Sequence, residues 1–575
     1  MPVHNEDIAA IFEEMADLLE IEGANPFRVR AYRNAARSVR SLGRELAEMV
    51  ASGEDLTQLP GIGKDLAAKI IEMVRTGKVR ALEKLHRKVP ASLEDLLHIP
   101  GLGPRRVRRL FDELGIETLE QLAEAARAGR LRTLPGFGAR TEQRILDALA
   151  AHRSQERRFL YSVARQYAEP LAAWLRKIPG VERVVVAGSY RRGRETVGDL
   201  DILVTVRADS PVMARFVTYD EVAEVISSGA TRASVILRSG LQVDLRVVTA
   251  HSLGAALHYF TGSKAHNIQI RRLGQQRGLK INEYGVFRGE RAIAGESEDS
   301  VFAAVGLPYI PPELRENRGE IAAAREGRLP RLIERKDLRG DLHCHSRASD
   351  GHADIETMAR AAREAGLEYL AITDHSRHLS VARGLDERRL LQQIEEIDRL
   401  NERLHGITLL KGIEVDILED GRLDLPDSVL AQLDLVVGAV HDHFGLSEKK
   451  QTARLLRAMA HKYFTLLAHP SGRLLLKREA YAVDMPRVVE AARERGCFLE
   501  LNAQPLRLDL KDNHCRLARE RGVPLSINSD SHGPDGFANL AYGINQARRG
   551  WLEKGDVLNT LPLGKLRKRL RGTMG

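Results

Sequence analysis

Two aspartates separated by one apolar residue stand in Gly198-Asp199-Leu200-Asp201-Ile202-Leu203. If this run is a strand, both carboxylates face one side, because side chains alternate across the pleat, and Leu200 faces the core. Such a pair can hold two Mg²⁺ (or Mn²⁺) ions, since these ions prefer oxygen ligands and bind carboxylates together with substrate phosphates. The pattern is typical of a site that transfers a nucleotidyl group.

A glycine-serine turn with two arginines precedes the pair, in Gly188-Ser189-Tyr190-Arg191-Arg192-Gly193. Turn amides and guanidinium groups are suited to bind phosphate oxygens. We therefore predict that a nucleoside triphosphate contacts Gly188, Ser189, Arg192 and Gly198.

A third carboxylate strengthens the prediction, because an isolated Asp-x-Asp is common on solvated strand edges. Asp244 lies within an apolar alternation, residues 241–248, where an unpaired charge would be costly to bury. Three acids on neighbouring strands indicate two metal ions and a general base. We expect Asp199 and Asp201 to bridge the ions, while Asp244 binds the catalytic ion and helps to activate an attacking 3′-hydroxyl.

Length and composition set the wider frame. A chain of 575 residues suggests about three or four domains. The net charge of +9 is consistent with a polyanionic partner. Its three cysteines form no CxxC pair, the first residues carry no signal-peptide pattern, and no run of about 18 apolar residues occurs. We expect a cytoplasmic, nucleoid-associated protein with no membrane span.

The region before residue 155 contains three Pro-Gly-x-Gly turns, each followed by a helix-like run. The second copy follows the first by 40 residues, and the third follows the second by 35. They resemble helix-hairpin-helix motifs, in which turn glycines and free helix amides contact DNA phosphates without reading sequence. The predicted DNA contacts are the glycines Gly61, Gly63, Gly101, Gly103, Gly136 and Gly138.

The first hairpin also resembles the amino-terminal lyase domain of polymerase beta relatives. Lys69 occupies the place of the lysine that forms a Schiff base with an abasic deoxyribose phosphate in those relatives. Arg28 and Tyr32 match the segment that binds a 5′-phosphate there, whereas Asp65 stands where some relatives have a second lysine. The alternative interpretation of Lys69 is a surface residue on an amphipathic helix.

A third landmark, His258-Tyr259-Phe260-Thr261-Gly262-Ser263, completes a resemblance to DNA polymerase family X. The resemblance implies that Tyr259, Phe260 and Gly262 line the pocket for the nucleotide sugar. It also implies that Asn267 and Arg271, on the helix that follows, contact the base and the template.

The chain departs from the family X pattern at two positions beside the chemistry. Gln242 stands where an arginine often precedes the third acid, and Lys264 stands where relatives often have an aspartate beside the incoming base. A lysine adds positive charge near the nucleotide. Our hypothesis is that Lys264 tightens dNTP binding before DNA arrives.

Residues 341–532 read as repeated strand-then-helix units, with a histidine or an acid where the strands end. Seven such units favour a barrel whose functional groups gather at the carboxyl ends of its strands. Histidines together with Asp and Glu are the ligands of zinc, manganese or iron. The candidate ligands are His343, His345, Asp350, His375, Glu414, His441, His469, Asp530 and His532.

This pattern resembles the polymerase and histidinol phosphatase (PHP) domain, a distorted seven-strand barrel with up to three Zn²⁺ or Mn²⁺ ions. The resemblance implies that one ion is held by His343, His345, Glu414 and Asp530, a second by Asp350, His375 and His532, and a third by Glu414, His441 and His469. His443 is close enough in sequence to exchange roles with His441. Phosphoester hydrolysis is the reaction implied.

The fold class predicted for the whole chain is multidomain. We expect an all-α helical lyase-like domain (1–85), fingers with two further hairpins (86–155), an α+β nucleotidyltransferase palm (156–250) and a thumb (251–315). A charged linker (316–339) then leads to the distorted (β/α)7 PHP barrel (340–575).

The favoured function is a bacterial family X DNA polymerase that fills short gaps in base excision repair. The PHP domain would remove nucleotides or phosphates from 3′ ends, with lyase or abasic-site activity in addition, and a small-molecule phosphatase is the alternative for that domain. Expected partners are gapped or nicked DNA and dNTPs, and the expected state is a monomer. Two rivals remain: a template-independent nucleotidyltransferase such as a tRNA end-adding enzyme, and a DNA-binding scaffold with only the hydrolase active.

Overall fold

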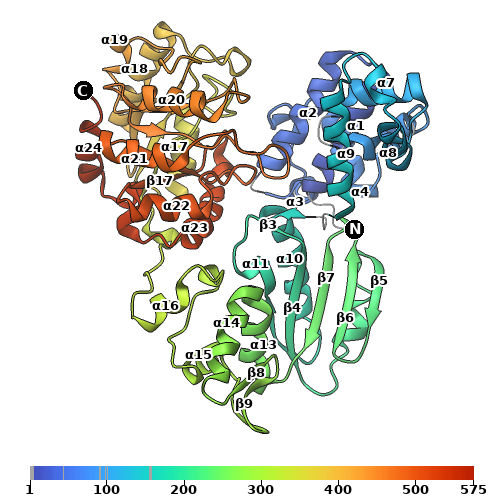
Figure 1. Cartoon of the computed structure of the whole chain (residues 1–575). Helices are drawn as coiled ribbons and strands as arrows, with labels where there is room; N and C mark the ends of the chain where they lie inside the picture. Colours follow the sequence, from blue (N-terminus) through green and yellow to red (C-terminus); the bar gives the residue numbers. More distant parts are fainter. Residues whose placement is uncertain (1–4, 43, 90–91, 98, 100–101, 155–157) are drawn as a thin grey trace. The chain divides into compact units, whose positions relative to one another are not determined.

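The protein is described by a computed structural model covering residues 5–42, 44–89, 92–97, 99, 102–154 and 158–575. It forms two compact units, Met1–Arg157 and Arg158–Gly575 (Figure 1). No helix within the described ranges is long and apolar enough to cross a membrane.

The first unit is entirely helical in its described part. Its helices are α1 Asn5–Glu22, α2 Pro26–Ser41, α3 Leu46–Ala51, α4 Lys64–Thr76, α5 Arg80–His86, α6 Ser92–Leu97, α7 Pro104–Leu114, α8 Leu119–Arg127 and α9 Ala139–Ser154. The glycine-rich turns lie directly before α4, α7 and α9. Gly61 and Gly136 adopt φ of +70° and +85°, which residues with a Cβ rarely reach, so these turns need glycine.

The segment expected to form the palm opens the second unit. Its five-stranded sheet has the order β2-β4-β7-β6-β5, from Val181–Val186, Asp199–Val206, Gln242–Val247, Arg232–Leu237 and Val222–Ser228. The short pair β1 Phe159–Leu160 and β3 Thr196–Val197 lies beside it. Helix α10, Tyr161–Arg176, buries Val163, Tyr167 and Leu171 in the core that the sheet shares. Strand β4 is paired on both sides, with β2 and β7, so the Asp-x-Asp pair lies on rigid backbone.

The thumb contains α13 Leu253–Thr261, α14 Lys264–Gln275, β8 Lys280–Asn282, β9 Gly285–Arg288, β10 Arg291–Ala294 and α15 Glu298–Ala304. The segment expected as a linker carries a short helix, α16 Glu320–Arg325. Ala323, Ala324 and Leu332 are buried in one cluster with Trp551 of the last domain. This segment is therefore packed rather than freely extended, because small apolar residues among its charges reach a shared core.

The last domain is a parallel seven-stranded barrel in chain order, and the structure describes all of its residues. The strands are β11 Gly340–Asp341, β12 Tyr369–Ile372, β13 Thr408–Asp416, β14 Leu435–Ala439, β15 Leu466–Leu467, β16 Phe498–Asn502 and β17 Leu525–Asn528. The N–H of His345 donates to the carbonyl of Ser531, so the first and last strands meet and the barrel is nearly closed.

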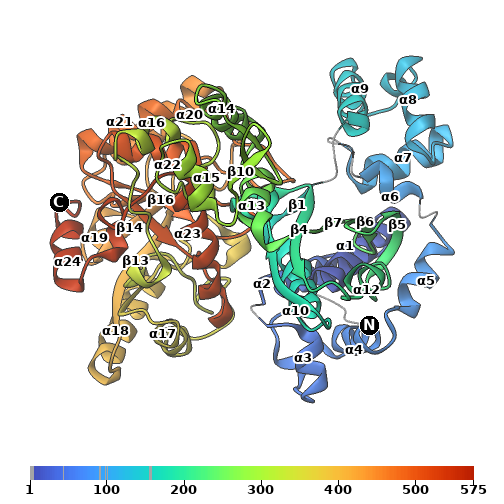
Figure 2. The same ribbon diagram turned by 90° about the horizontal axis from the view of Figure 1, so that it is seen from below.

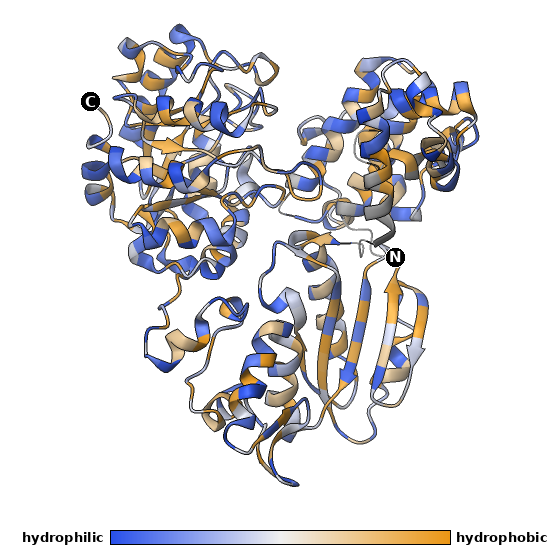
Figure 3. Ribbon diagram, viewed as in Figure 1, coloured by the Kyte–Doolittle hydropathy of each residue, from blue (hydrophilic) through white to orange (hydrophobic). Residues whose placement is uncertain are grey.

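Helices α17 Ile355–Glu364, α18 Glu387–Arg403, α19 Asp427–Leu430, α20 Glu448–Met459, α21 Met485–Arg495, α22 Asp512–Glu520, α23 Leu540–Arg549 and α24 Leu563–Arg571 accompany the strands. The strands of the palm and the helices of both units carry hydrophobic and hydrophilic residues along their length (Figure 3). The predicted fold class is confirmed: an all-α start, a nucleotidyltransferase palm and a (β/α)7 barrel.

Candidate active sites

The three palm carboxylates form one row across two neighbouring strands. β4 and β7 pair in parallel, and Asp201 lies directly opposite Asp244 in the register. Asp199, two residues earlier on β4, is exposed, whereas Asp201 is half-buried and Asp244 is 8% exposed. The row therefore runs from the sheet interior to solvent, which is the geometry needed to bind cations on one side and a solvated triphosphate on the other.

Asp201 is the member most affected by its surroundings. Burial first, and then the negative charges of Asp199 and Asp244, raise the pKa of Asp201 to about 7. Gly188 lies against it: a Cβ on this glycine would come within 2.6 Å of Asp201 Oδ2, and its φ is +62°. Only glycine lets the Gly188–Arg191 turn, helix α11, approach the carboxylates this closely.

The two arginines of this turn are held by acids from the thumb and the segment after it. Arg191 donates to both carboxylate oxygens of Glu298, at 2.9 and 2.6 Å. Arg192, which is 8% exposed, donates to the carbonyl of Thr261 at 2.7 Å and to Glu316 at 3.0 Å. The guanidinium of Arg192 thus connects the glycine-serine turn, residues 188–193, to the landmark at residues 258–263. A phosphate bound by Arg192 would have to share this guanidinium with Glu316.

The thumb landmark ends helix α13 and turns into α14. The rings of Tyr259 and Phe260 meet edge to face at 5.0 Å. Asn267 Nδ2 donates to the carbonyl of Tyr259 at 2.6 Å, and Gly262 leaves room for this, because a Cβ there would lie 2.3 Å from Asn267 Oδ1. Asn267 is thus tied to the turn in this structure.

The remaining predicted nucleotide and template residues lie on α14 and β7. Lys264 is the first residue of α14 and is exposed, as is Arg271 two turns later. Gln242 Nε2 lies 3.5 Å from Asp244 Oδ1, and Arg246 stacks over the ring of Phe260 at 4.5 Å. Arg246 therefore lies beside the third acid, Asp244. It follows that acid by two residues, whereas the arginine of the family X pattern precedes the acid by two.

In the helical unit, the predicted glycines Gly61, Gly63, Gly103, Gly136 and Gly138 are exposed, and Gly101 lies outside the described residues.

Lys69 Nζ forms an ion pair with Asp65 Oδ1 at 2.5 Å, and its side chain is only 12% exposed. Arg28 is exposed. Tyr32 is 2% exposed and packs edge to face against Phe12, which keeps its hydroxyl inside the helical core.

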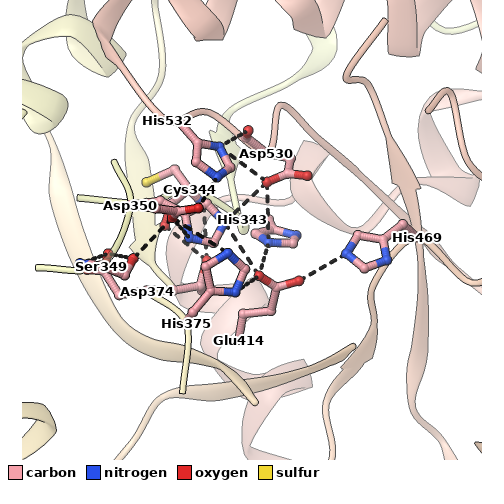
Figure 4. Close-up of polar contacts among 12 residues, drawn as sticks. His343, Cys344, Ser349, Asp350, Asp374, His375, Glu414, His469, Asp530 and His532 are labelled. Atoms are coloured by element: carbon pink, nitrogen blue, oxygen red, sulfur yellow. Dashed lines mark hydrogen bonds and ion pairs between the residues drawn. The ribbon is translucent and has the colours of Figure 1, made fainter. Parts of the chain in front are cut away.

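The barrel gathers its predicted ligands toward the carboxyl ends of its strands, and Figure 4 labels seven of the nine. Glu414 lies among several imidazoles: its Oε2 is 2.8 Å from His375 Nδ1 and 3.4 Å from His343 Nε2. Its Oε1 is 3.0 Å from His469 Nε2. All nine side chains lie in one cluster.

Ligand atoms within 4.8 Å of one another form three groups. They are His343 with His345 and Asp530; His345, Asp350, His375 and His532; and His375, Glu414 and His441. As predicted, His343, His345 and Asp530 group together, and so do Asp350, His375 and His532, but His345 and His375 are shared between two groups each. His469 belongs to none of the three groups, and Glu414 groups with His375 and His441 rather than with His343. His441 lies in the cluster, whereas His443 is 48% exposed and pairs with Asp442 and Glu419.

The donor set fits divalent cations. His343 Nε2 and His345 Nδ1 are buried without a hydrogen bond, and Glu414 Oε2 and Asp350 Oδ1 lie 3.4 and 3.8 Å from them, respectively. Buried polar atoms rarely lack partners, so atoms that converge in this way are suited to share an ion.

The directions of the pKa shifts of His343 and Glu414 agree with a site that binds cations. Burial opposes the charge of His343, yet Glu500, Glu414 and Asp530 raise its pKa well above the usual value. Burial would raise the pKa of Glu414, yet surrounding imidazoles lower it well below normal.

Sequence reasoning missed the carboxylates that orient these histidines. Glu500 on β16 accepts from His343 Nδ1 at 2.7 Å and from the N–H of His469 at 2.8 Å. Asp416 on β13 lies 2.8 Å from His441 Nδ1. Such partners fix the tautomer and ring orientation of a metal-bound histidine. Their signal was present, because each lies at or beyond the middle of a buried strand, but only contacts in space distinguish an orienting carboxylate from a ligand.

Comparison with known proteins finds family matches along much of the chain. Family models match for "Helix-hairpin-helix domain" (residues 3–79), "SAM-like Helix-hairpin-helix tandem" (93–151), "DNA polymerase beta palm" (164–243), "DNA polymerase beta thumb" (256–316) and "PHP domain" (341–504). The chain is 40% identical over 568 residues to DNA polymerase/3′-5′ exonuclease PolX of Bacillus subtilis, which covers 98% of both proteins.

Shorter relatives match less than half of the chain. A probable phosphatase of Thermoanaerobacter sp. (strain X514) is 30% identical over 243 residues, 40% of this chain and 94% of the relative. A probable phosphatase of Acetivibrio thermocellus is 34% identical over 203 residues, 33% of this chain and 78% of the relative.

Proposed function

Because the chain belongs to the PolX family of DNA polymerase/3′-5′ exonucleases, we propose that it fills short gaps in DNA and trims 3′ ends during repair. The family predicted from the sequence is confirmed, and the chain is a family X DNA polymerase with a PHP-domain exonuclease. It depends on divalent metals and acts on DNA and dNTPs. The observation that supports two separate chemistries best is the presence of two ligand sets, the aspartate row of the palm and the cluster of the barrel.

In the polymerase site, Asp199, Asp201 and Asp244 hold two Mg²⁺ or Mn²⁺ ions. When bound, these ions supply charge stabilisation for nucleotidyl transfer. Asp244, the most buried of the three, is placed to accept the proton of the primer 3′-hydroxyl, while exposed Asp199 faces the triphosphate.

The triphosphate is bound by the Gly188–Arg191 turn, which lies against these acids. Gly188, Ser189 and Gly198 offer backbone groups, and Arg192 offers its guanidinium. Tyr259, Phe260 and Gly262 form the sugar pocket, Asn267 and Lys264 contact the nucleotide, and Arg271 contacts the template strand. These assignments are supported by the turn between α13 and α14, where Arg192 donates to the carbonyl of Thr261 and Asn267 donates to the carbonyl of Tyr259.

In the hydrolytic site, the nine clustered side chains hold up to three Zn²⁺ or Mn²⁺ ions. When bound, these ions supply an activated water for phosphoester hydrolysis. Glu500 and Asp416 keep the rings of His343 and His441 turned toward the cluster. The substrate is a 3′-terminal nucleotide or a 3′-phosphate, and the similarity of part of the chain to probable phosphatases supports the second.

The helical unit binds the gap through its hairpin glycines, as a monomer on gapped or nicked DNA at the nucleoid. Lys69 is the nucleophile for removal of a 5′-deoxyribose phosphate, once Asp65 releases it, and Arg28 binds the 5′-phosphate. The buried position of Tyr32 limits it to supporting that segment.

A one-nucleotide gapped duplex tests the proposal. We expect dNTP incorporation to stop at one nucleotide, to require a template base, and to be faster when the gap carries a 5′-phosphate. Equal incorporation on a single strand without a template would favour the template-independent transferase instead. A substrate with a 3′-phosphate, assayed with Mn²⁺ alone, separates the phosphatase from the exonuclease.

A further inference from the structure

The palm contacts the barrel through a carboxylate that the chemistry above does not use. Glu195 lies between the glycine-serine turn, residues 188–193, and β3. Its backbone carbonyl accepts a hydrogen bond from the N–H of Tyr161 at 2.9 Å, which fixes the Glu195 backbone in the palm. Its carboxylate receives two hydrogen bonds from Arg473 of the barrel, at 3.1 and 2.6 Å. Gln546 on α23 donates to the same carboxylate.

This ion pair is largely removed from solvent. The side chain of Arg473 is 11% exposed and that of Glu195 is 23% exposed. Helix α23, which carries Gln546, lies beside the edge of the palm in both ribbon views (Figure 2). A shielded pair of this kind is screened less than a surface pair, so loss of one partner leaves a poorly solvated charge on the other.

Arg473 extends from Glu195 into the loops around the metal cluster. It stands four residues after the proposed ligand His469. Its Nε donates to the carbonyl of Arg507 at 3.0 Å, and its Nη2 donates to the carbonyl of Leu508. Arg507 in turn places Nε 3.6 Å from Oδ2 of Asp530, another proposed ligand.

The segment held by Arg473 is also tied to both ligands through Asp509. The Asp509 carboxylate accepts from the N–H of Ser471 at 2.9 Å, within the loop that begins at His469. The backbone of Asp509 pairs with Asn502, and Asn502 Nδ2 donates to Asp530 Oδ2 at 2.9 Å. Arg473 therefore fastens the loop after His469 to the segment that contacts Asp530.

A buried guanidinium needs a carboxylate, and the palm provides it. Burial opposes the charge of Arg473, but Glu195 raises its pKa, with Asp509 contributing less. Asp509 already accepts from Ser471. Without Glu195, two of the Arg473 donors would lose their charged acceptor, and the guanidinium would be free to leave the carbonyls of the 507–508 segment.

We propose that Glu195 is a positioning residue of the hydrolytic site. Through Arg473, this palm carboxylate holds the loop after His469 and the 507–509 segment in the conformation that the ligands His469 and Asp530 require. The proposal rests on the ligand set proposed above, and it makes metal binding in the barrel depend on a residue outside the barrel.

The test uses the full chain with Glu195→Gln, Arg473→Lys and the double variant. We expect each variant to need roughly tenfold more Mn²⁺ for half-maximal 3′ trimming, and to lose barrel metal at a correspondingly lower chelator concentration, because partners of metal ligands commonly change affinity by such factors. The double variant should be no worse than the more affected single variant, since both break one pair. One-nucleotide gap filling by Glu195→Gln should remain at the wild-type rate.

Glu313→Gln is the matched control. Glu313 accepts a hydrogen bond from Arg548 of α23 at 2.7 Å, and its side chain is 15% exposed. Arg548 donates another hydrogen bond to the carbonyl of Ile333, whereas Arg473 donates to the 507–508 segment. This variant should keep the wild-type Mn²⁺ requirement. A shift in Glu313→Gln equal to that in Glu195→Gln would overturn the proposal, because any pair at this interface would then have the same effect.

A reference variant separates this proposal from the ligand set. If His343→Ala with His345→Ala retains trimming, the ligand set itself is wrong. If that variant is inactive while Glu195→Gln and Arg473→Lys keep the wild-type Mn²⁺ requirement, the positioning role is wrong and the ligand set stands. If the shift in Mn²⁺ requirement of the double variant equals the product of the two single shifts, the positioning role is also wrong. Should Glu195→Gln lose gap filling through misfolding, Arg473→Lys decides, because it leaves the palm sequence intact.

Discussion

The aspartate row of the palm should make the metal-free protein less stable as pH rises, and Asp201 allows this to be measured. Its pKa is raised from the ordinary value of 3.8 to about 7 by burial and by Asp199 and Asp244. The folded protein therefore holds this proton more tightly than the unfolded chain does. This stabilising contribution is fully present below the ordinary pKa of 3.8 and is lost progressively as the pH rises to about 7, the pKa in the folded protein.

The size of the effect follows from linkage. Ionising Asp201 in the folded palm costs about 4 kcal/mol at pH 8 and about 2 kcal/mol at pH 5, relative to the unfolded chain. Asp201→Asn removes this cost. Without metal, we expect the variant to gain roughly 2 kcal/mol more stability over wild type at pH 8 than at pH 5.

Hydrogen–deuterium exchange of peptides from β4 and β7 is the suitable assay, because it reports the opening of the palm rather than of the whole multidomain chain. Variant and wild type are compared at the same pH, so intrinsic exchange rates cancel. Saturating Mg²⁺ should slow exchange in wild type at pH 8 and have little effect in Asp201→Asn. Asp209→Asn, an exposed aspartate after the same strand, serves as the control. Equal gains for Asp201→Asn at both pH values would refute the reasoning.

The other predictions concern single side chains. Lys264→Ala should weaken binding of dATP without DNA by roughly five- to tenfold, as expected for loss of one charge-assisted contact, and unchanged affinity in a titration would contradict the hypothesis. Glu500→Gln should lower the metal content of the barrel and the rate of 3′ trimming by roughly 10- to 100-fold, because His343 loses its orienting carboxylate; full metal occupancy by mass spectrometry would count against this role. Borohydride should trap the wild-type protein on DNA with a 5′-deoxyribose phosphate, and Lys69→Ala should not be trapped, while trapping of the variant would assign the chemistry to another amine. Asp65→Asn should increase trapping, since it removes the ion pair that holds the Lys69 ammonium.

Much of the architecture could be predicted because its signals are local. Asp199 and Asp201 lie two apart on a strand, and β-strand alternation alone places both carboxylates on one face. The barrel ligands follow apolar runs, and parallel strands bring their carboxyl ends to one face. His375 and Glu414 could therefore be expected near each other before their 2.8 Å contact was known.

The parts that could not be predicted depend on contacts between distant residues. No local pattern indicates that Arg192 is shared with Glu316, 124 residues away, or that Tyr32 is turned into the helical core. The expected linker reads as charged and aperiodic, yet Ala323 and Ala324 pack in a cluster with Trp551. Sequence also could not separate His441 from His443, because both stand at the end of one strand and only burial distinguishes them.

The central claim is that one chain carries two independent active sites with opposing effects on a 3′ end. A gapped duplex with a labelled primer, incubated with dNTPs, Mg²⁺ and Mn²⁺, measures both in one reaction. We predict that Asp201→Asn shortens the primer without extending it, and that His343→Ala with His345→Ala extends the primer without shortening it. Loss of both activities in either variant, or survival of both, would contradict the account.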